Sequence, residues 1–191
     1  FDGAHCVIFD PWGRADDWEK YLESRNVKPV AIYATHGHSD HISAAAQLAE
    51  QFGIDWYMSH ADLDLIDWGN GLLEYFDLPK LSPNDKTPID LTIGEHTILS
   101  GTKMRVFSLP GHTRGGMGFY FPDDNVFIVG DTIFQTSYGR TDLPGGNEKT
   151  LFESISKILD MHLPDWTAVV HGHGMHTTIG WLKQNNPFFK K

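Results

Sequence analysis

The chain has 191 residues, 40% of them hydrophobic and 13% aromatic, which is enough for one sizeable core and predicts a single catalytic domain over residues 1–191. Acidic side chains outnumber basic ones 25 to 15, and the formal net charge of -10 argues against binding to nucleic acid or to an anionic membrane surface. No apolar run is long enough for a transmembrane helix, and the single cysteine, Cys6, excludes an internal disulfide. We therefore expect a cytoplasmic protein that acts on a small molecule.

The first third of the chain alternates predicted strands and helices. Asp2-Gly3 is typical of a hairpin turn, and such a turn needs a preceding strand, so we expect a strand upstream of Phe1. Asp16, with Glu19 three residues later, is predicted to cap an amphipathic helix. The other elements expected here are strands at Cys6 to Phe9, Val30 to Thr35 and Ile54 to Met58, and a helix with apolar residues from Ile42 to Phe52.

The segment from Asp62 to Asp90 lacks sustained periodicity and is predicted to be loop-rich, with at most a short helix. Beyond it, turn residues separate five predicted strands that form an antiparallel region, at Leu91 to Ile93, Thr97 to Leu99, Met104 to Leu109, Gly118 to Phe121 and Val126 to Val129. Asn147 is predicted to cap a helix. A last strand at Thr167 to Val170 then precedes a short helix that starts near Thr177.

The most specific motif is Thr35-His36-Gly37-His38-Ser39-Asp40-His41, at the exit of a predicted strand. Imidazole and carboxylate groups suit zinc and related divalent ions. A loop this tight cannot point all four groups at one tetrahedral ion, because neighbouring ligands would need incompatible directions. The motif therefore predicts that two ions share the loop.

Three further segments place a polar side chain just beyond an apolar strand, with a glycine beside it. They are Pro110-Gly111-His112, Val129-Gly130-Asp131 and His171-Gly172-His173-Gly174. Glycine lets the backbone approach a buried ion closely, and strand ends hold ligands rigidly. The chain thus offers seven candidate metal ligands: His36, His38, Asp40, His41, His112, Asp131 and His173.

These motifs resemble those of the metallo-β-lactamase superfamily, and within it the glyoxalase II-like thioester hydrolases of the short form, which lack a C-terminal helical domain. The resemblance covers almost the whole chain, from Phe9-Asp10-Pro11 through THGHSDH, PGHTRG, VGDTIF and GRTDLPGG to HGHGMHTTIG. It implies an α+β fold, an αββα sandwich of two mixed β-sheets flanked by helices.

The resemblance also assigns the ligands. It implies that His36, His38 and His112 bind a first divalent ion, that Asp40, His41 and His173 bind a second, and that Asp131 bridges the two. The expected ions are zinc, with iron or manganese as alternatives. Asp40 and Asp131 are the expected catalytic carboxylates, and the implied reaction is hydrolysis of a thioester such as S-lactoylglutathione.

Several residues depart from the family pattern or have an open role. Trp12 stands where glycine is common, which predicts a narrower mouth of the site. His171 and His176 stand where proline is common, and whether either joins the site is open. Tyr138 and Arg140 are candidates for substrate contact or for support of the metal ligands. An ion pair of Arg140 with Asp142 that only fixes the loop is the structural alternative.

Three other functions compete with thioester hydrolysis. A persulfide dioxygenase of the same superfamily would use one iron bound by two histidines and an aspartate. A lactamase of the type without a cysteine ligand is compatible with the chain, because its sole cysteine is Cys6. A non-catalytic module with the metals as structural braces is the third alternative, against which the intact ligand set argues, because a structural site needs no open coordination position.

Overall fold

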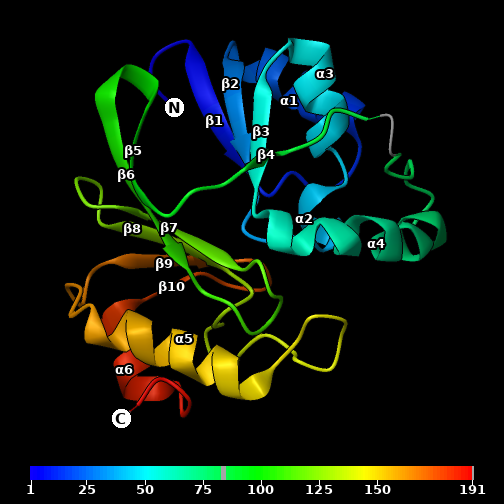
Figure 1. The fold of residues 1–191 in the computed structure, drawn as a ribbon. Coiled ribbons are helices and arrows are strands. Elements are labelled where there is room, and N and C mark those ends of the chain that lie inside the picture. Colours follow the sequence, from blue (N-terminus) through cyan, green and yellow to red (C-terminus); the bar gives the residue numbers. More distant parts are fainter. Residues whose placement is uncertain (83–84, 191) are drawn as a thin grey trace. The chain divides into compact units, whose positions relative to one another are not determined.

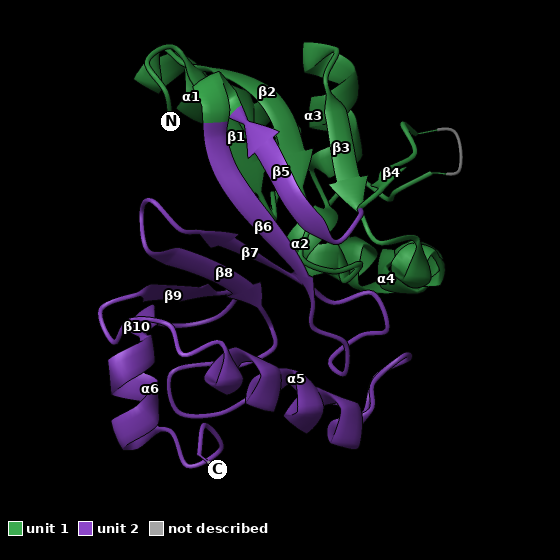
Figure 2. Cartoon of the chain, turned by 60° about the vertical axis from the view of Figure 1, so that its left-hand side comes forward, with its two compact units in different colours: residues 1–91, 99–101 green, residues 92–98, 102–191 purple. Residues whose placement is uncertain are grey.

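The computed structural model describes residues 1–82 and 85–190, and the described chain divides into two compact units. Unit 1 comprises residues 1–91 and 99–101, and unit 2 comprises residues 92–98 and 102–191 (Figure 2). Among the described residues, none of the helices combines the length and the apolar character needed to span a bilayer. The single domain predicted for residues 1–191 stays a prediction.

Unit 1 is built on a parallel sheet of four strands in the order β1-β2-β3-β4 (Figure 1). Its elements are β1 (His5–Phe9), α1 (Ala15–Arg25), β2 (Lys28–Tyr33), α2 (Ser39–Ile42), α3 (Ala45–Phe52), β3 (Asp55–Met58), α4 (Leu63–Tyr75) and β4 (Ile89–Asp90), with 3₁₀ turns at His60–Asp62 and Leu99–Gly101. Helices link the successive strands, which is how parallel neighbours are joined. The resemblance implied two mixed sheets, and this one is parallel throughout.

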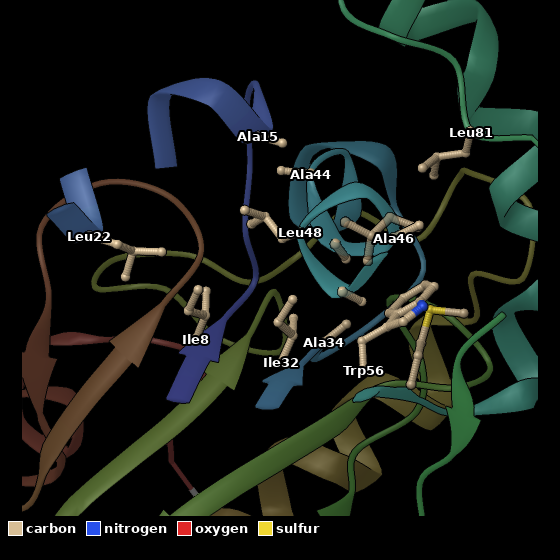
Figure 3. Close-up of a cluster of buried hydrophobic side chains, with 14 of the residues drawn as sticks. Ile8, Ala15, Leu22, Ile32, Ala34, Ala44, Ala46, Leu48, Trp56 and Leu81 are labelled. Carbon is tan, nitrogen blue, oxygen red and sulfur yellow. The ribbon is translucent and has the colours of Figure 1, made fainter. Parts of the chain in front are cut away.

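The core of unit 1 lies between the sheet and the helices α1 and α3. Leu22 of α1 and Leu48 of α3 are buried against Ile8 and Ile32, which alternate with more exposed residues along their strands (Figure 3). Trp56 closes one end of the cluster, and its indole donates a hydrogen bond to the carbonyl of Lys86 at 2.5 Å. This packing fixes the carboxyl ends of β1 and β2, from which the first candidate ligand loop emerges.

Unit 2 contains a six-stranded sheet in the order β10-β9-β8-β7-β6-β5, with α5 and α6 on one face (Figure 1). Its elements are β5 (Gly94–Ile98), β6 (Thr102–Ser108), β7 (Met117–Phe121), β8 (Val126–Gly130), α5 (Glu148–Asp160), β9 (Ala168–His171), β10 (Thr177–Thr178) and α6 (Ile179–Asn185). All pairs are antiparallel except β8 with β9, which are joined through α5. The predicted antiparallel region is therefore confirmed for four of its five strands, those between Thr97 and Val129.

Most predicted elements agree with the structure, and the predicted caps give a mixed result. The side chain of Asn147 accepts a hydrogen bond from Thr150 N at 3.0 Å and caps α5, as predicted. The side chain of Thr178 caps the final helix in the same way. The cap of α1 was predicted wrongly, because Arg14 occupies the capping position without a side-chain bond and Asp16 lies within the first turn. Its carboxylate still favours the helix through the positive end of the dipole.

Two other predictions are wrong. The segment predicted as loop-rich contains α4, a helix of 13 residues, and only residues 83–84 of that segment lie outside the described part. The strand predicted at Leu91 to Ile93 instead lies two residues earlier, at Ile89–Asp90, where it pairs with β3.

The predicted turn at Asp2-Gly3 is confirmed, since Asp2 and His5 exchange backbone hydrogen bonds of 2.8 and 3.0 Å.

Candidate metal centre

The histidine loop of unit 1 follows β2 and runs into α2. Its three imidazoles are buried, with 2% of His36, 5% of His38 and 3% of His41 exposed. His36 Nε2 and His38 Nδ1 lie 3.1 Å apart, and the ring centroids of His36 and His41 are separated by 4.1 Å. Asp40 is partly exposed, and its carboxylate lies within 4.8 Å of a ring nitrogen of His41. The loop therefore gathers all four of its predicted ligands.

Asp10, at the end of β1, holds this loop in place. Its carboxylate accepts hydrogen bonds from the backbone nitrogen of Thr35 at 2.7 Å and from the Thr35 hydroxyl at 2.8 Å. The same carboxylate lies 2.9 Å from His41 Nδ1. Because a carboxylate can only accept, His41 carries its hydrogen on Nδ1, and the lone pair stays on Nε2 for a metal.

A second support for the loop is the 3₁₀ turn at His60–Asp62. The backbone nitrogen of Gly37 donates to Asp62 Oδ2 at 3.0 Å, and Asp62 is fully buried. A Cβ atom on Gly37 would lie 2.7 Å from the carbonyl oxygen of Asp62, so the position needs glycine. Neither Asp10 nor Asp62 was predicted from the sequence as a support, although Asp10 belongs to the Phe9-Asp10-Pro11 motif.

Unit 2 brings its three predicted ligands together around Asp131. Asp131 Oδ2 lies 3.5 Å from His112 Nε2 and 3.1 Å from His173 Nε2. The three residues follow β6, β8 and β9, and these strands run in the same direction, so their carboxyl ends meet at one edge of the sheet. His112 and Asp131 are buried, whereas 54% of the His173 side chain is exposed.

The loop from Gly139 to Gly146 supports this cluster through its backbone. His112 Nδ1 donates to the carbonyl oxygen of Arg140 at 2.7 Å, which leaves Nε2 as the metal-binding nitrogen. A Cβ atom on Gly139 would overlap the carbonyl oxygen of Asp131, so glycine is required for this close approach. Arg140 thus supports a predicted ligand through its main chain.

The side chains of Arg140 and Tyr138 have partners within unit 2. The Arg140 guanidinium donates two hydrogen bonds of 2.7 Å to Asp142 and lowers the pKa of that carboxyl to about 2. The Tyr138 hydroxyl donates to Glu148 at 2.9 Å, which raises the pKa of the phenol. The ion pair that fixes the loop is therefore present, and contact of Tyr138 or Arg140 with substrate stays a prediction.

His171 lies beside the cluster with only 4% of its surface exposed, and its ring centroid is 5.6 Å from that of His176. Burial and the neighbouring His176 lower the pKa of His171. Among the residues described, the groups of potential metal ligands include neither of these two histidines. Other histidines have simple structural partners: His60 Nε2 lies 3.0 Å from the carbonyl of Pro88, and His96 Nε2 lies 2.8 Å from that of Thr92.

The residues fit divalent metal ions. Both clusters consist of imidazole and carboxylate groups, which are the ligands that zinc, iron and manganese take in proteins. In each cluster one histidine, His41 or His112, has its second ring nitrogen fixed by an oxygen acceptor, the usual orienting arrangement behind a metal ligand.

Comparisons with known proteins place the chain in a family. The profile of the family described as the metallo-beta-lactamase superfamily matches residues 2–173, a range that includes all seven candidate ligands. Hydroxyacylglutathione hydrolase GloC of Haemophilus influenzae is 35% identical over 189 residues, which cover 98% of this chain and 88% of the relative.

Two crystal structures are similar to this chain in both fold and sequence. That of BLEG-1 B3 metallo-beta-lactamase has a TM-score of 0.84 and 35% identity, and the match covers 99% of this chain and 90% of that one. That of TTHA1623 in a di-iron-bound form has a TM-score of 0.82 and 33% identity, with 95% and 87% covered. The α+β fold with two sheets and flanking helices is thereby confirmed.

Proposed function

We propose that this chain, which belongs to the metallo-β-lactamase superfamily, is a metal-dependent hydrolase that cleaves thioesters. In this proposal two divalent ions are held by the predicted set of ligands: His36, His38, Asp40, His41, His112, Asp131 and His173. The observation that carries the proposal is the arrangement around Asp131 Oδ2, which has a histidine nitrogen within 3.5 Å on two sides. A carboxylate flanked in this way is suited to bridging two ions.

Two bound divalent ions lower the pKa of a water and polarise a carbonyl group. The chain's own residues would do the rest. We assign to Asp40 the orientation of the attacking water, since it is the carboxylate of the histidine loop and is partly exposed. Asp10 and the carbonyl of Arg140 keep His41 and His112 in the tautomer whose lone pair is on Nε2.

The reaction needs no strong general acid. The water oxygen forms a bond to the acyl carbon as the C–S bond breaks, and the thiolate leaves with the electron pair. Because thiols have a pKa of about 8.5, the thiolate is a good leaving group near neutral pH. One proton of the water goes to the thiolate and the other to solvent, so the products are a carboxylate and a thiol.

The name of the Haemophilus influenzae relative supports a thioester substrate, with S-lactoylglutathione as the first compound to test. Zinc is the first metal to expect, and the di-iron-bound form of TTHA1623 makes iron the main alternative. A second candidate function, lactam hydrolysis, is supported by the 35% identity with the BLEG-1 lactamase. The partner in either case is a small molecule.

A hydrolysis screen of the metal-loaded protein tests the proposal. We expect release of free thiol from S-lactoylglutathione and other thioesters, loss of this activity with a chelator, and its return with added zinc or iron. Turnover of the lactam nitrocefin without any thioester cleavage would instead support the lactamase. Oxygen consumption with a persulfide would point to the dioxygenase, and no turnover at all would favour a metal-braced module.

A further inference from the structure

Unit 1 exposes five large apolar side chains on α4 and on the loop after β1. They form what we call the aromatic wall, with exposed fractions between 39% and 82%: Trp12, Trp68, Leu72, Tyr75 and Phe76. The spacing of the three helical members, four and then three residues, puts them on one side of α4. A cluster of exposed apolar side chains in a water-facing position is typical of a binding surface.

The aromatic wall continues from the helix to the loop after β1. The ring of Phe76 meets the ring of Tyr75 with centroids 5.2 Å apart and the ring of Trp12 at 5.7 Å, edge to face in both cases. Arg14 donates to Asp77 and ties the same loop to the residue after Phe76. Trp12, which departs from the family pattern, is therefore a member of a larger apolar surface.

The wall is held rigidly against the histidine loop. Gly69, on the neighbouring face of α4, packs so closely on α2 that a Cβ atom there would lie 2.9 Å from Ser39 Cβ. On the other side, Gly13 N donates to Ser43 Oγ at 2.8 Å, and Ala44 N donates to the carbonyl of Pro11 at 3.1 Å. Both parts of the wall are thus anchored to the residues that flank α2.

The wall begins next to a predicted metal ligand. The ring centroid of Trp68 lies 5.8 Å from that of His38, while Leu72 and Tyr75 follow Trp68 along the helix. Trp68 is therefore within reach of a substituent of a substrate whose carbonyl reacts at an ion bound by His38. A substituent that extends from the ion towards Trp68 contacts the apolar side chains of the wall.

The charges around the wall indicate which substituent this is. The helix α4 carries Asp64, Asp67 and Glu74 and has neither lysine nor arginine. Lys80 pairs with Glu74 and Arg14 pairs with Asp77, so the acidic groups remain in excess around the wall. Glutathione has two carboxylates and one ammonium group, so its net charge is negative and an acidic surface repels it, whereas an apolar acyl group gains from burial against aromatic rings. The acyl side of the thioester is the substituent that fits.

We propose that the aromatic wall receives the acyl group of the substrate, so that the enzyme prefers thioesters of aromatic or medium-chain carboxylic acids over lactoyl thioesters. This inference rests on the proposed thioester hydrolysis and adds the class of acid to it. An apolar group that gains contact with apolar side chains of an enzyme typically changes the specificity constant by about tenfold or more.

The test compares two substrates with the same thiol, S-phenylacetylglutathione and S-lactoylglutathione. We expect wild-type kcat/KM to be about tenfold higher for the phenylacetyl compound, and we expect Trp68→Ala and Phe76→Ala each to reduce that ratio towards one. Trp166→Ala is the matched control, because Trp166 is an exposed tryptophan of unit 2 that lies outside the wall. It should leave the ratio unchanged.

A binding measurement gives a readout that is independent of turnover. We expect S-phenethylglutathione, a thioether that cannot be hydrolysed, to bind more tightly than S-methylglutathione in calorimetry, and Trp68→Ala to remove the difference. If both thioesters are cleaved at equal rates, the wall is not an acyl site although thioester hydrolysis stands. If neither is cleaved and the thioethers bind equally, both the proposed function and this inference are wrong.

Discussion

Asp10→Asn should lower both the metal affinity and the stability of the protein. The Asp10 carboxylate accepts two hydrogen bonds from Thr35 and lies 2.9 Å from His41 Nδ1. If the asparagine oxygen keeps the bond to Thr35 N, its NH₂ group faces His41 Nδ1, and two donors then oppose each other. His41 must move its hydrogen to Nε2, where it blocks the metal.

The expected magnitude follows from these contacts. Removing the charge weakens hydrogen bonds worth about 1.5–3 kcal/mol each, and since the amide replaces them in part, we expect unfolding to become easier by about 2–3 kcal/mol. Loss of such an orienting partner typically lowers metal affinity about 10–100-fold. Competition with a chromophoric chelator measures the affinity, and urea unfolding followed by circular dichroism measures the stability.

The control is Asp55→Asn, which removes an exposed carboxylate that pairs with Lys86 at 3.2 Å in the same unit. This variant should change neither the metal affinity nor the free energy of unfolding by much, because exposed ion pairs contribute little to stability. If Asp10→Asn binds zinc within twofold of the wild-type affinity, the orienting role of Asp10 is wrong.

Three further predictions concern unit 2, with one control in unit 1. Gly139→Ala should lower the free energy of unfolding, measured in urea, by several kcal/mol, because the added Cβ would overlap the carbonyl of Asp131. The control is Gly71→Ala in α4, where a Cβ meets no neighbour, and it should raise the free energy of unfolding by about 1 kcal/mol. Asn186→Ala should lower the free energy of unfolding by about 2–3 kcal/mol, since the buried amide donates to the carbonyls of Phe134 and Ser137 at 2.8 and 3.1 Å. A thermal midpoint equal to that of the wild type would contradict this prediction. In an NMR titration Asp142 should show a pKa of about 2, and Arg140→Ala should return this pKa towards 3.8. Because the folded-state pKa is depressed, the stabilising ion pair is complete above pH 3.8 and is lost as the pH falls towards 2. An unshifted Asp142 in the wild type would show that the pair does not form in solution.

The candidate ligands could be singled out from the sequence because each of them follows a strand and lies beside glycine or within a dense histidine motif, and their binding of metal stays a prediction. Their supports were harder to predict. Asp10 and His41 are separated by 31 residues and meet only because β1 and β2 are neighbours in a parallel sheet. Nothing local to Asp10 indicates which histidine it orients.

The helix α4 was missed because its apolar residues do not form a single stripe. Leu65 and Leu73 are buried, while Trp68 and Leu72 are exposed, so the apolar residues occupy two faces and the helical period is obscured. Gly69 and Gly71 lower the helix propensity further. Gly69 is explained only by its close contact with Ser39, a tertiary constraint that no local pattern carries.

The central claim is that the seven predicted ligands hold two divalent ions. Metal analysis of the purified protein, after dialysis against metal-free buffer, tests it most directly. We predict two equivalents of zinc or iron per chain for the wild type and fewer for His38→Ala and His173→Ala. A single iron per chain that His173→Ala leaves in place would contradict the two-ion site.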